Sequence, residues 1–224
     1  MTNEDHGQVL NTDQLTVAVL ADGAGGADAG GTAAKILVPA IADWLASSFQ
    51  EQYYCDGATV RRRLVQLVTK LFQSFAEEHS LDPKELACTL IAVAVDAEGR
   101  GIVLHLGDGI VLRKRELDQH YGVVSSPENG LVSNATYLTM NCNMYEHCRF
   151  YRLQETGPLR LIAMTDGAAA HLVERRSKEG WVYCAPCSLE PETLLNYLAA
   201  SDPMDDYSFF VVSSHPHLAI ESDI

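Results

Sequence analysis

The chain has 224 residues, of which 47% are hydrophobic and 21% are charged, so it can bury the core of one domain. Its 16 Lys and Arg stand against 30 Asp and Glu, which gives a formal net charge of −14. Because such a surface repels phosphate backbones and anionic lipids, the composition argues against a protein that binds nucleic acid or a membrane surface.

No apolar run reaches the roughly 20 residues that a membrane-spanning helix needs. The first eight residues are acidic and polar, unlike a secretory signal. The six cysteines are compatible with a reducing compartment. Together these features predict a cytoplasmic protein.

The N-terminal half predicts one strand followed by two helices. The first apolar run, Leu15–Ala21, is short and rich in valine, as in a buried strand. A glycine-rich stretch at residues 22–31 leads into a helical pattern for which Thr32 is the predicted N-cap. A second helical pattern covers residues 59–78, and the Asp56-Gly57 pair before it predicts a turn.

The rest of the chain is mostly strand-like. Two strands at 89–95 and 102–106 are predicted to form a hairpin. The other predicted elements are strands at 110–113, 135–140, 149–153 and 159–164, a helix at 190–200 and a last strand at 207–213. This order lacks the steady alternation of a doubly wound sheet. It predicts an α+β fold in which mostly antiparallel sheets are flanked by helices.

One local pattern, an apolar strand that ends in a small residue followed by Asp-Gly, occurs three times. The three pairs are Asp22-Gly23, Asp108-Gly109 and Asp166-Gly167. Two further acidic groups lie at residues 3–5 and 205–206. A single Asp-Gly pair is usually a turn, since both residues tolerate positive φ. Three pairs that each follow an apolar strand favour a shared site instead.

Several carboxylates at one edge of a core repel each other, and bound divalent cations usually offset this repulsion. Oxygen ligands favour Mg²⁺ or Mn²⁺ over zinc or copper. Two such ions can share a water, lower its pKa and direct it at phosphorus. The acidic pattern therefore predicts a metal site for phosphoryl chemistry. The plainer alternative is an acidic structural domain whose Asp-Gly pairs are only turns.

In chain order, these segments resemble the motifs of the metal-dependent (type 2C) Ser/Thr protein phosphatases. The stretch DGAGGADAGGTAA at 22–34 is similar to the family's DGxGGxxxGxxA motif. Its other motifs are matched in order by residues 3–5, 87–89, 106–109, 164–167 and 205–208. A segment at 127–139 is similar to compact bacterial members. The resemblance spans residues 3–213.

The resemblance implies an αββα sandwich, with two mostly antiparallel sheets flanked by helix pairs. The implied phosphatase domain covers residues 1–214, and residues 215–224 would be a flexible tail. The implied cofactors are two Mn²⁺ or Mg²⁺ ions, with a third, weaker ion. By position, the implied metal ligands are Asp22, the Gly23 carbonyl, Asp166, Asp205 and Asp108, with Glu4 and Asp5 acting mainly through coordinated waters.

The implied roles of these ligands differ. Asp22 would bridge the two ions, and the Gly23 carbonyl would bind the second ion. Asp166 and Asp205 would complete the first site, and Asp108 would help Asp166 to hold the third ion. The implied activity is hydrolysis of phosphoserine and phosphothreonine by a water that bridges the two ions, with no protein nucleophile. The implied partners are a phosphoprotein substrate and a Ser/Thr kinase or its targets, in bacterial signalling.

Two departures from the family pattern bear on activity. The family places an Arg before the N-terminal motif, and here no Arg precedes Glu4. The substrate phosphate is therefore expected to bind weakly unless another cation serves. Ala24 stands where eukaryotic members often carry a His, so protonation of the leaving group would fall to coordinated water. The missing Arg favours one alternative, a pseudophosphatase that acts as a regulatory or binding module.

Overall fold

The computed structural model describes residues 3–27, 29–128, 136–177, 180–184, 190–201 and 205–214. The predicted tail at 215–224 lies outside these residues, as does the part of the bacterial-type segment at 129–135.

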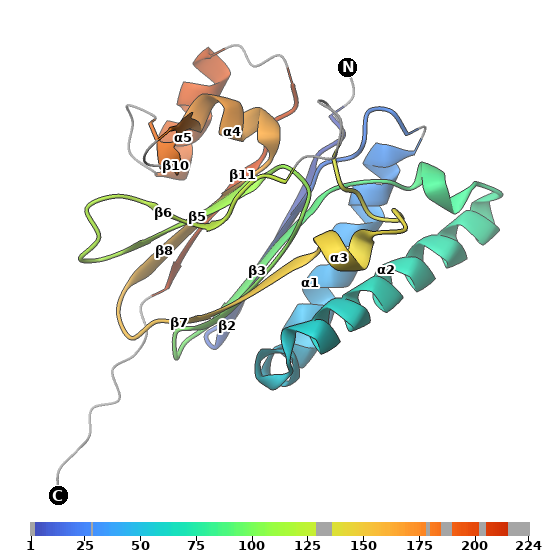
Figure 1. The fold of residues 1–224 in the computed structure, drawn as a ribbon, viewed down its shortest axis with the longest axis horizontal. Coiled ribbons are helices and arrows are strands. Elements are labelled where there is room, and N and C mark those ends of the chain that lie inside the picture. The colour runs from blue at the N-terminus through green and yellow to red at the C-terminus, as the bar shows by residue number, and fades with distance from the viewer. Residues whose placement is uncertain are drawn as a thin grey trace, which may run out of the picture.

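Two antiparallel sheets lie face to face in the middle of the molecule (Figure 1). The first sheet has the order β1-β2-β3-β4-β7. Its strands are β1 (His6–Asn11), β2 (Leu15–Ala21), β3 (Leu90–Asp96), β4 (Arg100–Leu106) and β7 (Arg149–Gln154). The second sheet has the order β11-β8-β5-β6. Its strands are β11 (Phe209–Ser214), β8 (Leu159–Met164), β5 (Ile110–Arg115) and β6 (Gly122–Ser125).

Helices cover the outer face of each sheet (Figure 1). The first sheet is covered by α1 (Gly30–Tyr54) and α2 (Gly57–His79), with the short α3 (Met144–His147) beside α2. The second sheet is covered by α4 (Asp166–Leu172) and α5 (Pro191–Ala200), next to a small hairpin of β9 (Val173–Arg176) and β10 (Gly180–Tyr183). This arrangement confirms the predicted α+β fold and its αββα layers.

The buried side chains form three apolar layers that match this architecture. One layer lies between α1, α2 and the first sheet and includes Leu37, Ile41 and Leu64. A middle layer joins the inner faces of the two sheets. The third layer lies between the second sheet and α4 and α5. Burial of these apolar surfaces is the main stabilisation of the sandwich.

Several local predictions differ from the structure. Helix α1 begins at Gly30 after Ala29, with no side-chain cap, so the prediction of Thr32 as N-cap was wrong. Asp56 does not belong to a simple turn, because its Oδ1 accepts a 2.9 Å hydrogen bond from the Thr59 amide and caps α2. The described residues 136–140 form an isolated bridge and a turn instead of the predicted strand.

The described parts of the chain contain no helix of the length and apolarity that crossing a membrane requires.

Candidate functional site

An acidic pocket of about 880 Å³ lies at one end of the sandwich. The carboxylates that line it come from five separate segments of the chain and are Glu4, Asp22, Asp108, Asp166, Asp205 and Asp206. The backbone of Gly23 also lines the pocket. Six of the seven predicted ligand residues therefore share one cavity, and the seventh, Asp5, lies buried against Thr165 at its edge.

The strand registers explain why these acids meet. In the first sheet, Leu20 pairs with Ile91, so β2 ends where β3 begins. In the second sheet, Met164 at the end of β8 pairs with both Ile110 at the start of β5 and Phe209 at the start of β11. Antiparallel pairing thus gathers the residues before β5, after β8 and before β11 at one end, next to the residues that follow β2.

The loop that carries Asp22 is tied to the start of β3. The Asp22 amide donates to Thr89 Oγ1 at 3.0 Å, and the Thr89 amide donates to the Asp22 carbonyl at 2.8 Å. The Gly23 amide donates to the Glu4 carbonyl at 3.2 Å, which adds the N-terminal segment. A Cβ at Gly23 would lie 2.5 Å from the Gly30 carbonyl carbon, so only glycine allows the loop to approach α1 this closely.

The second sheet contributes its acids through a network that includes the N-terminus. Thr165 Oγ1 donates to Asp5 Oδ2 at 3.0 Å, and the Thr165 amide donates to the Ser208 carbonyl at 3.0 Å. The Glu4 amide donates to Asp206 Oδ2 at 2.7 Å. These bonds join the first residues of the chain to the segment before its last strand. The segments at residues 4–5 and 205–208 are therefore both part of the site.

Burial and repulsion between the carboxylates disfavour ionisation of the acids in the pocket. Burial, followed by the charges of Asp5 and Asp166, raises the pKa of Asp22 to about 9. Burial also raises the pKa of Asp5, and burial together with the charges of Asp108 and Asp205 raises the pKa of Asp166. Acids that resist ionisation in this way gain most from a cation placed among them.

The described residues contain no group of three or more His, Cys, Asp or Glu side chains already arranged to hold a metal ion. Two other observations fit a hard divalent cation. Asp5 Oδ1 is buried without a hydrogen-bond partner in the described parts of the chain, a costly state for a carboxylate oxygen. The donors around the pocket are oxygens of carboxylates and backbone, which suit Mg²⁺ or Mn²⁺. The residue set therefore fits such an ion, although binding requires the side chains to move together.

Sequence reasoning missed four residues that line this pocket, namely Asp206, Thr136, Asn141 and Lys84. Asp206 belongs to the acidic group at residues 205–206 but was assigned no role there, and its carboxylate accepts a hydrogen bond from the Glu4 amide. Thr136 Oγ1 donates to Asp108 Oδ2 in a short hydrogen bond. For Asn141 and Lys84, no local pattern in the sequence points to the pocket.

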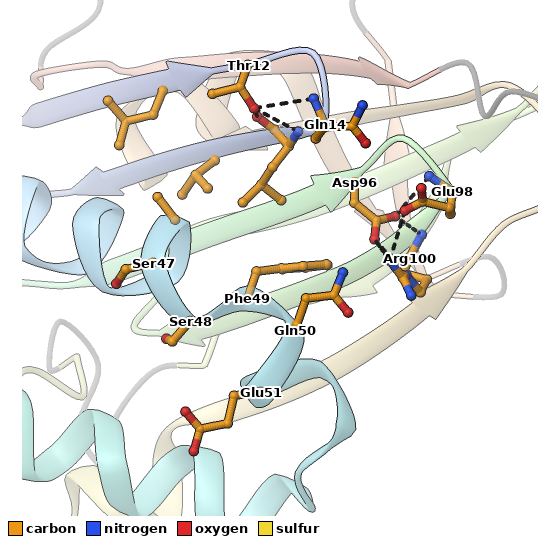
Figure 2. A pocket seen from close by; sticks show the side chains of 14 residues that line it. Thr12, Gln14, Ser47, Ser48, Phe49, Gln50, Glu51, Asp96, Glu98 and Arg100 are labelled. Carbon is orange, nitrogen blue, oxygen red and sulfur yellow. Dashed lines mark hydrogen bonds and ion pairs between the residues drawn. The ribbon is translucent and has the colours of Figure 1, made fainter.

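A second pocket, of about 560 Å³, lies at the opposite end of the first sheet (Figure 2). Its charged residues include Arg100, whose guanidinium is paired with Asp96 at 2.6 Å and with Glu98 at 2.8 Å (Figure 2). Because this guanidinium is already paired with neighbouring carboxylates, the described lining of the pocket offers no unpaired cation to a ligand. The acidic pocket is therefore the stronger candidate for chemistry.

A comparison of the sequence with models of protein families identifies the family to which the chain belongs. The model described as "Protein phosphatase 2C" matches residues 1–200, which include every acidic segment of the site except residues 205–206. The chain belongs to the protein phosphatase 2C family. Membership agrees with the resemblance of the motifs and with the αββα layers. No curated protein sequence matches the chain.

Several solved structures share the fold of this protein phosphatase 2C chain. A serine/threonine phosphatase of S. agalactiae has a TM-score of 0.65 and 18% identity, with 96% of this chain and 93% of that one covered. PppA of Pseudomonas aeruginosa, described as a regulatory component of T6SS, has a TM-score of 0.60 and 16% identity, with 96% and 91% covered. RsbX, solved in complex with magnesium, has a TM-score of 0.57 and 9% identity, with 96% and 88% covered.

Proposed function

We propose that this protein phosphatase 2C chain is a metal-dependent phosphatase that hydrolyses phosphoserine and phosphothreonine in proteins. The observation that carries the proposal is the acidic pocket, where the aspartates of three Asp-Gly pairs meet Glu4, Asp205 and Asp206. Family membership and the fold of the neighbouring phosphatases support it. The proposed substrates are phosphoproteins of the cytoplasm, with a Ser/Thr kinase or its targets as partners.

We propose that Mg²⁺ or Mn²⁺ is held by the acids that the motifs single out. Asp22, Asp166 and Asp205 would form the first site, with Asp22 and the Gly23 carbonyl forming the second. Asp108 would serve a weaker third site. When bound, such ions lower the pKa of water and neutralise charge on the phosphoryl oxygens. The soft donors Cys and His are absent among the described residues that line the pocket, which agrees with this choice of metal.

The surrounding residues orient these acids. Thr89 holds the backbone of Asp22, and Thr136 donates to Asp108. Thr165 directs one oxygen of Asp5 and leaves the other without a partner in the described chain. Ala24, which lines the pocket beside Gly23, offers no side-chain proton. These acids and the residues that hold them therefore supply orientation and negative charge, and a water in the pocket would give the leaving group its proton.

The proposal is tested by turnover of a phosphothreonine peptide with Mn²⁺ and with EDTA. Activity should require the metal and should be lost in Asp166→Asn, because that carboxylate faces the pocket. Asp13→Asn is the matched control, since Asp13 is an exposed aspartate in the turn between β1 and β2, at the far end of the first sheet. Equal and negligible rates with Mn²⁺ and with EDTA would refute the proposal.

One observation favours a second candidate, a pseudophosphatase that binds phosphoproteins without hydrolysing them. No Arg is among the described residues that line the pocket, and such a residue would help to grip a phosphate. A chain that binds the phosphopeptide in the presence of Mn²⁺ but never releases phosphate would support this alternative.

A further inference from the structure

Lys84 is the one basic side chain among the described residues that line the acidic pocket. It lies in η1 (Pro83–Glu85), the short turn between α2 and β3. A phosphate monoester that enters the pocket is itself an anion, and the pocket wall carries six carboxylates. A cation at this wall is therefore in a position to offset repulsion of the substrate.

The ammonium group of Lys84 is available for a ligand. The side chain is exposed, and among the described residues it has no hydrogen-bond or ion-pair partner. Arg149, by contrast, is already occupied near the pocket. Its guanidinium donates to the carbonyls of Gly107 and Ser126 and pairs with Glu128 at 3.5 Å. Lys84 therefore offers a positive charge that no ion pair within the described part of the chain neutralises.

The backbone that carries Lys84 is held in place. The Lys84 amide donates to Asp82 Oδ1 at 3.0 Å, and the Leu86 amide donates to the Pro83 carbonyl at 3.2 Å. The Leu86 side chain is fully buried, which anchors the end of the turn. The flexible part is thus only the long side chain, whose ammonium can adjust to a ligand.

The turn is also tied to the loop that carries the central acid of the site. The Ala24 amide donates to the Ala87 carbonyl at 2.9 Å, and Gly23 forms a bridge with Cys88. These contacts hold the segment that begins three residues after Lys84 against the loop at 22–24. Because Lys84 and Asp22 line the same pocket, a phosphate bound beside Asp22 would lie in the cavity that the lysine side chain borders.

We propose that Lys84 binds the phosphate group of the substrate, through the oxygens that do not react. The proposal rests on the phosphatase function proposed above. An ammonium that contacts these oxygens does so in the ground state and in the transition state alike. Its loss therefore raises KM and leaves kcat nearly unchanged.

The test compares three variants in the Mn²⁺-loaded protein with a phosphothreonine peptide. Lys84→Met should raise KM by about tenfold, the loss expected for one charge-assisted hydrogen bond. Lys84→Arg should restore most of the affinity because it keeps the charge. Lys70→Met is the matched control, since Lys70 is an exposed lysine on α2 that does not line the pocket. It makes the same change in net charge.

A second readout does not depend on turnover. Calorimetry should show that inorganic phosphate binds the Mn²⁺-loaded Lys84→Met protein about tenfold more weakly than the wild type. Equal KM values and equal phosphate affinities in Lys84→Met and Lys70→Met would show that Lys84 is only a solvated surface residue, which overturns the proposal. If the wild type shows no turnover, the phosphatase function fails, and the phosphate affinities alone decide the role of Lys84.

Discussion

Gly167→Ala offers a direct test of how the site is packed. Gly167 is buried in the first turn of α4, directly after Asp166. A Cβ at this position would lie 2.0 Å from the Asp206 carbonyl oxygen and 3.4 Å from Asp205 Cβ. Since ordinary contact begins near 3.4 Å, the segment 205–206 would have to retreat by about 1.4 Å.

This displacement affects stability and the metal ligands at once. Overpacking of this kind typically costs about 1–3 kcal/mol of the free energy of unfolding. In a chain of this size, each kcal/mol lowers Tm by about 2–4 °C. A shift of about 1 Å in a catalytic group can reduce the rate by about 100-fold. We therefore expect Gly167→Ala to lower Tm, weaken Mn²⁺ binding and strongly reduce phosphopeptide turnover.

The measurements are thermal unfolding, Mn²⁺ calorimetry and phosphopeptide kinetics on Gly167→Ala and a matched control. Gly157→Ala is the control, because a Cβ there would have no atom within 4 Å. If Gly167→Ala matched Gly157→Ala in Tm and in Mn²⁺ affinity, the close packing of α4 against residues 205–206 would be refuted.

Three further predictions concern pH, metal and helix capping. Without metal, thermal stability should fall between about pH 4 and pH 9, because the folded state keeps a proton on Asp22 that an unfolded carboxyl with a pKa of 3.8 releases. Asp22→Asn should flatten this slope in Tm against pH, and an unchanged slope would contradict the assignment. Mn²⁺ at 100 times its Kd should add about 2.7 kcal/mol to the free energy of unfolding, and no rise in Tm would argue against a native metal site. Asp56→Ala should cost about 1 kcal/mol in denaturant unfolding through loss of its cap on Thr59, whereas Glu77→Ala, an exposed change in the same helix, should cost little.

The sequence predicts well those helices and strands whose buried apolar residues form a continuous run or repeat at a regular spacing. The bounds of β2 at Leu15–Ala21 are predicted without error, and α1 and α2 follow from apolar residues repeated at helical spacing. Strand β1 (His6–Asn11) was missed. It is an edge strand in which half-buried and exposed residues alternate, so it contains no apolar run.

Two other misses have local causes. Helix α4 begins at Asp166, directly after β8 and Thr165, and its first residues were read only as an acidic motif. The prediction of a strand at 135–140 was wrong, because the described part of this segment makes other hydrogen bonds and adopts another backbone conformation. Thr139 Oγ1 accepts the Cys88 amide at 3.0 Å, and Met140 has a φ of 64°, which no strand allows.

The candidate site was predictable in its acids but not in its supporting contacts. Asp-Gly pairs after apolar strands are visible in the sequence, and their motif order places them together. The bond from the Glu4 amide to Asp206 and the position of Lys84 at the pocket depend on how distant segments pack. Such contacts leave no local pattern, so only a structure reveals them.

The hydrogen bond between Glu4 and Asp206 joins residues 202 positions apart in the chain. During synthesis residue 4 leaves the ribosome before residue 206, so the two cannot bond until the segment that carries Asp206 has emerged. A nascent chain that stops short of residue 206 therefore carries an incomplete acidic pocket. Any activity of the pocket would begin only once residues 205–206 can pack against the segment at residues 3–5.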